Sequence, residues 1–362
     1  MASHLITKKF QMRLFAVGII CCVWLLTGCT KGANGEALKE AEDVKDVGAV
    51  QGSKMFTNPI LDNGADPWVT SKDGIYYYTQ TTGNSIRIWK SRTLTGLATA
   101  EYKDVWFPPL EGPNTSNIWA PELHYLNGKW YIYYAADNGQ NENHRMFVLE
   151  SETDDPLGAY ADRGMLDTAG RWAIDGTVLY KEDGSLYLIW SGWEGDVNVS
   201  QHLYIAPMSN PYTISGKPVE ISRPAYDWEL VGTPTINEGP EVLLHDDQIF
   251  VIYSASGSWT DDYCLGMLST RMSSDVMNPT SWAKYAQAVF AKTDRVFGPG
   301  HSSFAKSLDG KEDWILYHGA KTQGAGWNRN VRMQPFGWNA DGTPNFGKPI
   351  AEGTPIPVPG GE

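Results

Sequence analysis

The sequence predicts an all-β fold, namely a five-bladed β-propeller that forms a single domain. The first observation behind this prediction is composition: aromatic residues make up 12% of the 362 residues, and the chain contains 37 glycines and 21 prolines. Aromatic residues favour strands, and glycine and proline favour tight turns. The other two observations are a segment plan that recurs five times and the hairpin signals inside it.

Five segments between residues 65 and 317 share this plan. In each, an acidic or histidine residue beside glycine or proline leads into an apolar strand, a turn and an aromatic strand. The turns carry the polar pairs Asp73-Gly74, Asn127-Gly128, Asp183-Gly184, Asp246-Asp247 and Asp309-Gly310. Asx-Gly pairs between such runs are a strong signal for a β-hairpin. Each segment is therefore predicted to begin with two antiparallel strands.

The polar residue that opens a segment, here called its anchor, is Asp66, Glu122, Asp175, Glu238 or His301. The steps between successive anchors are 56, 53, 63 and 63 residues. A four-stranded propeller blade takes roughly 40–50 residues, and loops supply the rest. Five anchors at this spacing predict five blades, with every anchor facing the same end of the central channel.

Residues 1–28 are predicted to form a lipoprotein signal peptide. Lys8, Lys9 and Arg13 precede an apolar run from residue 14 to residue 26, which is shorter than the ~20 residues needed to span a bilayer. The run ends in Leu26-Thr27-Gly28-Cys29, which resembles the lipobox of bacterial lipoproteins. We therefore expect Cys29 to carry a lipid, and the alternative is an uncleaved membrane anchor.

The rest of the chain divides into a tether and one domain. Residues 29–54 are polar, acidic and poor in aromatic residues, which predicts a flexible tether behind the lipidated cysteine. Residues 55–362 are predicted to be the catalytic propeller, with the tail from residue 353 lying on the surface or disordered. The protein is expected to be a monomer anchored to a membrane, facing the periplasm or the cell surface.

Cysteine content and charge limit the partners. Without the signal peptide and the lipidated Cys29, only Cys264 remains, so no internal disulfide or cysteine metal site is expected. Loss of Lys8, Lys9 and Arg13 with the signal changes the net charge from −13 to −16. Phosphate binding needs clustered lysine and arginine, so a nucleic-acid partner is excluded. A neutral or weakly charged molecule or polymer is the expected partner, and no organic cofactor is expected.

Four of the five anchors are acidic, and propeller closure would bring them together. Grouping buried like charges costs free energy unless they are protonated, paired with a cation or used in chemistry. Paired carboxylates suit glycosidic cleavage, which needs a protonated acid at the leaving oxygen and an ionised partner across the sugar ring. A carboxylate beside Glu238 would disfavour its ionisation and keep it protonated near neutral pH.

Six motifs in register resemble glycoside hydrolase family 43 over essentially residues 58–350. They are Asn63-Gly64-Ala65-Asp66-Pro67, Trp119-Ala120-Pro121-Glu122, Ile174-Asp175-Gly176-Thr177, Asn237-Glu238-Gly239-Pro240, Gly298-Pro299-Gly300-His301-Ser302-Ser303 and Gly326-Trp327-Asn328-Arg329-Asn330-Val331-Arg332-Met333. The resemblance implies that Asp66 is the general base and Glu238 the general acid. It also implies that Asp175 raises the pKa of the acid and orients it.

The resemblance implies further residues of the site. Trp119 would form an aromatic wall for the terminal sugar, and Arg332 would contact the sugar and the acid, with Arg329 as the alternative. Glu122 stands where relatives often have aspartate, and we place it with the substrate-binding residues. His301 would hold a calcium ion in the channel, directly or through water.

Glu241 is a rival for the general acid, because it lies only three residues after Glu238. A regular strand would point these two side chains to opposite sides, so Glu241 is expected to have a structural role.

The sequence therefore predicts an exo-acting, inverting α-L-arabinofuranosidase that acts on plant cell-wall-type arabinan or arabinose-decorated oligosaccharides. The preference for arabinofuranose rests on likeness to the family's arabinofuranosidases around residues 58–119 and in Gly326-Trp327-Asn328-Arg329-Asn330. The alternatives are a β-xylosidase, a β-galactofuranosidase, and a glycan-binding lipoprotein without catalysis. All three catalytic carboxylates are present, which favours an enzyme over a binding protein.

Overall fold

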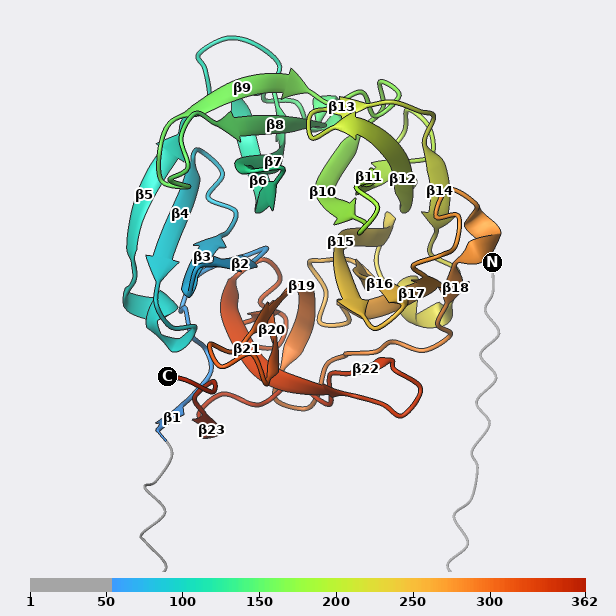
Figure 1. Ribbon diagram of the computed structural model, residues 1–362. Helices are drawn as coiled ribbons and strands as arrows, with labels where there is room; N and C mark the ends of the chain where they lie inside the picture. Colours follow the sequence, from blue (N-terminus) through green and yellow to red (C-terminus); the bar gives the residue numbers. More distant parts are fainter. Residues whose placement is uncertain (1–53) are drawn as a thin grey trace, which may run out of the picture. The chain divides into compact units, whose positions relative to one another are not determined.

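Five blades surround a central channel in the computed structural model, which describes residues 54–362 (Figure 1). The predicted signal peptide and the lipid site at Cys29 lie outside the described residues. Blades 1, 2 and 5 are separate four-stranded sheets. Blades 3 and 4 are joined into one sheet by a short parallel pairing of Ser200 with Thr235 and Gln201 with Ile236. The predicted five-bladed propeller is confirmed.

The strands of each blade are given in order from the inner strand, at the channel, to the outer edge. Blade 1 consists of β2 (Trp68–Lys72), β3 (Ile75–Thr79), β4 (Ile86–Ser91) and β5 (Glu101–Trp106). Blade 2 consists of β6 (Ser116–Leu126), β7 (Lys129–Asp137), β8 (Arg145–Ser151) and β9 (Tyr160–Met165). Blade 3 consists of β10 (Ala173–Tyr180), β11 (Leu186–Trp193) and β12 (Ser200–Asn210), with β13 (Thr213–Ile214) and β14 (Val219–Ser222) at its edge.

The last two blades follow the same order. Blade 4 consists of β15 (Thr235–His245), β16 (Gln248–Ala255), β17 (Cys264–Arg271) and β18 (Ala283–Lys284). Blade 5 consists of β19 (Phe297–Lys306), β20 (Asp313–Ala320), β21 (Arg329–Trp338) and β22 (Pro344–Asn345). Four short 3-10 helices lie in the described loops: η1 (Thr95–Thr99), η2 (Asn141–Asn143), η3 (Asp227–Glu229) and η4 (Pro279–Ser281). No helix among residues 54–362 has the length and apolar character needed to cross a membrane.

The predicted hairpin turns join the first two strands of each blade. Asp73 and Gly74 both have positive φ, as do Asn127 and Gly128, which is the backbone of a type I′ turn. Asp246, Gly184 and Gly310 also have positive φ in the other three turns. Glycine, asparagine and aspartate tolerate this conformation best, so the turn chemistry explains why the two strands pair directly after it.

The core consists of five hydrophobic clusters, and each fills the space between two neighbouring blades. Strand alternation distributes side chains between them: Tyr76 and Tyr78 of β3 pack against blade 5, whereas Tyr77 packs against blade 2. This arrangement accounts for the aromatic richness of the chain, because large rings fill the wedge between flat sheets. Most of the aromatic residues are therefore core residues.

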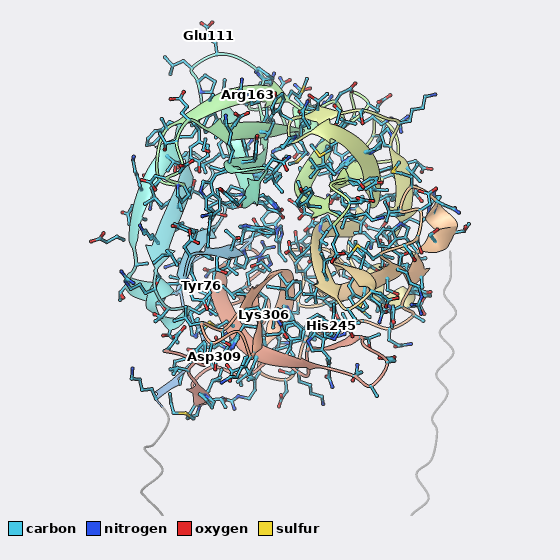
Figure 2. The ribbon with its side chains drawn as sticks, in the orientation of Figure 1. Tyr76, Glu111, Arg163, His245, Lys306 and Asp309 are labelled. Atoms are coloured by element: carbon cyan, nitrogen blue, oxygen red, sulfur yellow. The ribbon has the colours of Figure 1, made fainter. Side chains whose placement is uncertain are left out.

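The ring closes between blade 1 and blade 5, which come from opposite ends of the domain. The Tyr76 hydroxyl donates to the Lys306 carbonyl at 2.7 Å, and both residues lie in the region where blades 1 and 5 meet (Figure 2). Asn58 Nδ2 donates to the Met333 carbonyl at 2.9 Å, and the Met333 N–H donates back to Asn58 Oδ1 at 2.9 Å. We call this contact the seam.

The C-terminal tail strengthens the seam. β23 (Ile356–Pro357) pairs with β1 (Met55–Phe56), and the Glu362 carboxylate accepts the backbone N–H of Leu94. The tail is therefore ordered against blade 1 and is not a disordered end.

Candidate active site

Each inner strand has a backbone kink in its first half, or just before it in blade 1, and this kink positions the predicted site residues. One residue at each kink has positive φ: Asp66 (57°), Ala120 (41°), Asp175 (54°), Gly239 (51°) and His301 (46°). In blades 2 to 5 the pairing register of the inner strand shifts at this place, as in a β-bulge. The kink turns the residues at the strand entry toward the mouth of the channel, and its recurrence in all five blades points to function.

The five anchors do not occupy equivalent positions relative to these kinks, although their recurrence in the sequence led us to expect it. Asp66, Asp175 and His301 occupy the kink itself, whereas Glu238 precedes the kink residue of its blade and Glu122 lies two residues beyond. Trp119 and Glu238 therefore occupy matching positions in blades 2 and 4. The prediction that all anchors are structurally equivalent is wrong in these two blades, because the register differs from blade to blade.

Asp66 is held by side chains from blades 1 and 5. The Thr81 hydroxyl donates to Asp66 Oδ2 at 2.6 Å, and His301 Nδ1 lies 3.2 Å from Oδ1. Arg329 Nη1 lies 3.5 Å from the same oxygen, and the Asp66 N–H donates to His318 Nδ1 at 3.0 Å. The Asp66 side chain keeps 16% of its surface exposed. A water molecule can therefore reach the carboxylate although its orientation is fixed.

Glu238 lies in a drier environment on β15. It is 8% exposed, and its Oε1 accepts a hydrogen bond from the Tyr263 hydroxyl at 2.9 Å. Burial raises the pKa of Glu238 to about 7, and the charge of Asp66 acts in the same direction. The Tyr263 hydrogen bond and the Arg329 charge oppose that rise. Such a carboxyl keeps its proton close to neutral pH, as a general acid requires.

Asp175 is tied to the backbone beside Glu238. Its Oδ2 accepts the Gly239 N–H at 2.9 Å. Burial raises the pKa of Asp175 well above its usual value, and the charges of Glu238 and Asp66 add to the effect. The two buried carboxyls therefore compete for protons, and the geometry suits Asp175 to orienting Glu238. Burial, rather than a neighbouring charge, is the larger cause of the raised pKa of Glu238.

Glu241 and Glu122 lie deeper in the channel than the three acids. The bulge at Gly239 lets Glu238 pair with Ser254 and Glu241 with Ile252, so both glutamates face the same side of the sheet. The expectation that they face opposite sides is wrong, because the bulge inserts one extra residue between them. Glu241 nevertheless lies three residues further along β15, and its pairing partner is two residues from that of Glu238.

Glu122 occupies the matching position in blade 2, two residues beyond Ala120, and lines a narrow pocket with Asp66 and His301. Its Oε2 lies 2.9 Å from His124 Nε2, and the carboxyl is 5% exposed. Burial and the charge of Glu241 raise the pKa of Glu122 well above its usual value. The Glu241 Oε2 atom is buried without a hydrogen-bond partner. These two carboxyls lie further along their strands than the three acids, and a contact of Glu122 with substrate stays a prediction.

The structure favours Arg329 over Arg332 as the arginine of the site. Arg332 is buried, donates to Asn330 Oδ1 at 2.9 Å and lies 3.6 Å from Glu352, away from the three acids. Arg329 approaches Asp66, and its charge acts on both Asp175 and Glu238. The two arginines are three residues apart on β21, so strand alternation sends their side chains to opposite faces. The choice of Arg332 is therefore corrected.

The surroundings of His301 do not fit a calcium ion as the side chains stand. No group of three or more histidine, cysteine, aspartate or glutamate side chains converges within residues 54–362. Calcium prefers six to eight oxygen ligands, often including water, and the described acidic and histidine side chains alone do not supply that number around His301. We derive no chemical step through a metal.

Trp119 lies at the entry of β6 beside the channel mouth. Its ring stacks on the His144 imidazole, with 4.0 Å between ring centroids and an interplanar angle of 24°. His144 is fully buried and lies 3.0 Å from Asp137. The indole therefore has a rigid backing, as an aromatic wall for a sugar requires.

Three residues that contact the acids were not foreseen: Thr81, Tyr263 and His318. Thr81 follows the aromatic second strand of blade 1, and His318 lies near the end of the second strand of blade 5, where the chain returns to the channel mouth. A polar residue at the end of such a strand is a usable sequence signal. Tyr263 lies in the loop before β17, and no repeat or motif distinguishes it from the other tyrosines.

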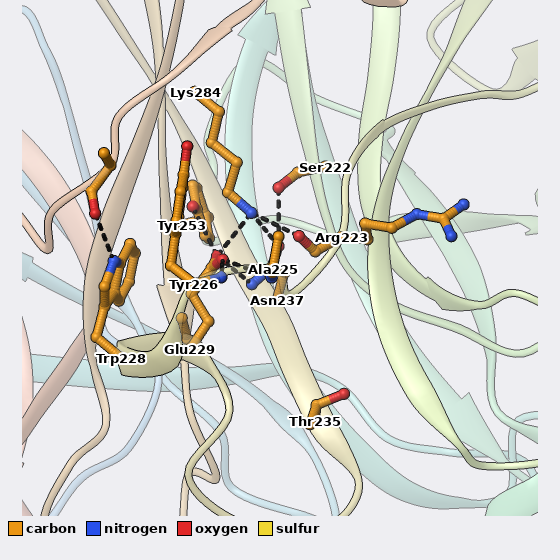
Figure 3. A network of polar contacts seen from close by, with 12 residues as sticks. Ser222, Arg223, Ala225, Tyr226, Trp228, Glu229, Thr235, Asn237, Tyr253 and Lys284 are labelled. Atoms are coloured by element: carbon orange, nitrogen blue, oxygen red, sulfur yellow. Dashed lines mark hydrogen bonds and ion pairs between the residues drawn. The ribbon is translucent and has the colours of Figure 1, made fainter.

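A buried polar network supports the strand that carries Glu238 (Figure 3). Glu229 is fully buried, and its Oε1 lies 2.7 Å from Lys284 Nζ and accepts from Tyr253 at 2.9 Å and Asn237 at 3.0 Å. Burial alone would raise the pKa of Glu229, but hydrogen bonds from Lys284 and the backbone lower it overall. Asn237 precedes Glu238, so this network fixes the backbone from which the acid projects.

Known proteins share this architecture and sequence. An extracellular exo-α-(1→5)-L-arabinofuranosidase of Streptomyces avermitilis is 42% identical over 320 residues, which cover 84% of this chain and 66% of that protein. An enzyme of the same description from Streptomyces chartreusis is 37% identical over 271 residues, covering 73% of this chain and 82% of that protein. The chain thus spans just under two thirds of the Streptomyces avermitilis relative.

The crystal structure of an α-L-arabinofuranosidase from Lactobacillus brevis matches with a TM-score of 0.77 and 37% identity, covering 83% of this chain and 98% of that one. A xylan β-1,4-xylosidase from Bacillus halodurans is 18% identical with a TM-score of 0.65, which shows a common fold only. The family model described as glycosyl hydrolases family 43 matches residues 56–344. With kinked inner strands that carry three acids to one channel mouth, this chain belongs to glycosyl hydrolases family 43.

Proposed function

We propose that the protein is an exo-acting α-L-arabinofuranosidase that releases arabinose with inversion of configuration. The observation that carries this proposal is the contrast between two carboxyls. Glu238 is buried with a pKa of about 7, whereas Asp66 is partly exposed and is bound by Thr81 beside Arg329. One carboxyl is suited to donating a proton and the other to accepting one. The relatives at 37–42% identity that are described as arabinofuranosidases support the sugar.

In the proposed reaction, Asp66 takes a proton from a water molecule while the water oxygen forms a bond to the anomeric carbon. The bond from that carbon to the leaving oxygen breaks, and Glu238 gives its proton to this oxygen. The products are arabinose and a shortened chain that ends in a hydroxyl group. Afterwards Asp66 releases its proton to solvent and Glu238 takes one up. Asp175 holds the Gly239 N–H and thereby the direction of Glu238.

Stereochemistry tests this division of labour. Attack by water opposite the leaving group predicts that the first sugar formed has the inverted anomeric configuration. Proton NMR during the first minutes of hydrolysis measures it, before the sugar equilibrates between its anomers. A retained anomer would mean that Asp66 attacks the sugar itself.

The sugar preference is tested by a substrate screen. We expect release of nitrophenol from the nitrophenyl α-L-arabinofuranoside, and much less from the β-xyloside and the β-galactofuranoside. Arabinan, arabinoxylan and xylo-oligosaccharides then show which polymer is used. Asp66→Ala is the matched control, because it keeps the fold and removes the base. Equal rates on the β-xyloside would favour the β-xylosidase alternative, and binding without turnover would favour a glycan-binding protein.

We also propose that the protein acts outside the cytoplasm as a monomer tethered through a lipid on Cys29. The two Streptomyces relatives described as extracellular support export, and the lipobox-like sequence supports the tether. Membrane fractionation of a bacterial host that expresses the full chain tests the tether, because Cys29→Ala should release the protein from the membrane. Light scattering of the soluble variant tests the monomer.

Calcium at His301 stays a prediction, supported by the family resemblance alone. Its test is the melting temperature and activity of the protein after chelation, with elemental analysis to prove that no metal remains. A metal-free sample that is unchanged in both would reject it.

A further inference from the structure

A cleft of about 490 Å³ opens beside the base, between blades 1 and 5. Its walls come from three segments: the stretch before Asp66, the β3–β4 loop with the start of β4, and the β20–β21 loop. Thr81 and Arg329, which contact Asp66, also line it. The cleft is therefore continuous with the reacting centre, and its volume is typical of a small-molecule site.

The charges of the cleft are already neutralised. The Arg87 guanidinium is bound by Asp104 through two hydrogen bonds, of 2.8 Å and 2.9 Å. Arg329 lies 3.5 Å from Asp66. The remaining polar lining consists of amides and hydroxyls, among them Asn63, Gln80, Asn84, Thr82 and Asn328. Amide groups both donate and accept hydrogen bonds, so this surface fits a neutral molecule rich in hydroxyl groups.

Trp327 adds an aromatic platform at the rim. Its side chain is 68% exposed, the largest exposure of any aromatic residue in the described part of the chain. Its Nε1 donates to Ser258 Oγ at 3.2 Å, and its ring meets Trp259 edge to face, with 6.2 Å between centroids. An exposed indole costs free energy, so a ring that is fixed and still uncovered suits stacking against a sugar.

The cleft is built before any ligand arrives. The Gln80 side chain accepts from the Tyr78 hydroxyl at 2.8 Å. A Cβ atom on Gly64 would lie 2.3 Å from Gln80 Oε1 and 2.6 Å from Val331 Cγ2, so a larger residue at position 64 would displace these side chains. The loop that carries Trp327 is closed by backbone hydrogen bonds from Asn328 to Ala325 and from Lys321 to Asn328. Preorganised walls reduce the entropy cost of binding.

Arg329 connects the Trp327 end of the cleft to the residues around the acid. Arg329 Nη2 donates to the Ser258 carbonyl at 2.7 Å, and the Arg329 guanidinium lies 5.8 Å from the centre of the Tyr263 ring. Tyr263 in turn binds Glu238. The leaving oxygen must lie next to Glu238, so a chain bonded to that oxygen can extend toward Trp327.

We propose that this cleft binds the leaving part of a neutral oligosaccharide, with Trp327 stacking on one of its sugar rings. The inference rests on the proposed function: in an exo-acting enzyme only the terminal sugar lies on the other side of the cleaved bond. The cleft thus makes the enzyme favour arabino-oligosaccharides of three or more residues over short aryl glycosides.

The test compares chain lengths. For the unaltered protein we expect kcat/KM on linear α-1,5-arabino-oligosaccharides to rise from two to five residues. Trp327→Ala should reduce kcat/KM on the pentasaccharide about tenfold, the effect of losing roughly 1.4 kcal/mol of stacking. The loss should be smaller on the disaccharide and smallest on the nitrophenyl glycoside. Tyr125→Ala is the control, because Tyr125 is also exposed and lies at the opposite end of its inner strand.

Calorimetry separates this inference from the proposed function. The inactive Glu238→Ala protein should bind the pentasaccharide more tightly than Glu238→Ala/Trp327→Ala. Binding without turnover by the active protein would contradict the proposed function and leave the cleft supported. Equal binding by the two variants, or an equal loss at every chain length, would overturn the cleft. Release of arabinobiose instead of arabinose would place the cleft on the wrong side of the cleaved bond and overturn it too.

Discussion

The hydrogen bond from Tyr263 to Glu238 leads to a quantitative prediction about pH. Tyr263→Phe removes the hydroxyl that donates to Glu238 Oε1 at 2.9 Å and keeps the ring that stacks on His318. That hydroxyl favours the ionised carboxylate and so lowers the pKa of Glu238 against the effect of burial. Without it the acid holds its proton more tightly. The basic limb of the pH profile should therefore move to higher pH.

The size of the change follows from the burial of the pair. Glu238 is 8% exposed and Tyr263 is 1% exposed, so solvent does not screen the bond or replace it. A hydrogen bond to a charged group contributes about 1.5–3 kcal/mol, and each 1.36 kcal/mol corresponds to one pKa unit. We expect the basic limb to move upward by about one to two pH units from its position near the pKa of about 7.

The assay is kcat/KM against pH on an arabino-oligosaccharide, whose leaving group needs the proton of the acid. Because kcat/KM reports the free enzyme, the limb reflects Glu238 without bound sugar. Tyr317→Phe is the matched control: Tyr317 is buried as well, but its hydroxyl binds Gln334 rather than an acid. A limb that stays in place, or that moves to lower pH, would refute the reasoning, as would an equal movement in Tyr317→Phe.

Four further substitutions separate the carboxyls. Glu238→Ala should lose most activity on natural oligosaccharides and much less on dinitrophenyl glycosides, whose leaving group departs unprotonated. The same pattern in Glu241→Ala would identify Glu241 as the acid. Asp175→Asn keeps an acceptor for the Gly239 N–H but can no longer ionise next to Glu238, so the basic limb of its pH profile should move downward. An upward movement would contradict the coupling of the two carboxyls. Burial raises the pKa of Glu241, so its contribution to stability is present below its unfolded pKa and is lost as pH rises. The melting temperature of Glu241→Gln should therefore fall by about 2–4 °C less between pH 5 and pH 8 than that of the unaltered protein. An equal fall in both proteins would contradict this.

The architecture was predictable because it repeats. A strand, a polar turn and an aromatic strand recur with similar spacing, and the structure places a blade at each recurrence. The three acids were also identifiable, because each stands at the entry of an inner strand. Their roles as base, acid and orienting carboxyl stay predictions.

Details within the site depended on features that a sequence does not display. The bulge at Gly239 changes which face Glu241 occupies, and a single inserted residue has no compositional signature. The choice between Arg329 and Arg332 depends on which face of β21 meets the channel, and both residues lie in one motif. His318 binds the backbone of Asp66 from 252 residues away, so nothing local connects them. Other contacts across the seam also join residues that are far apart in the sequence, so local sequence patterns do not reveal them.

The seam also determines when the enzyme can work. Asp66 belongs to the first blade, but His301, His318 and Arg329 reach it from the last. A chain that folds from its N-terminus could form four blades while Asp66 still lacks these partners. Catalytic competence would then arrive only with the final segment. Activity can thus serve as a reporter of complete folding, and a chain truncated before blade 5 should be inert even where its first four blades remain intact.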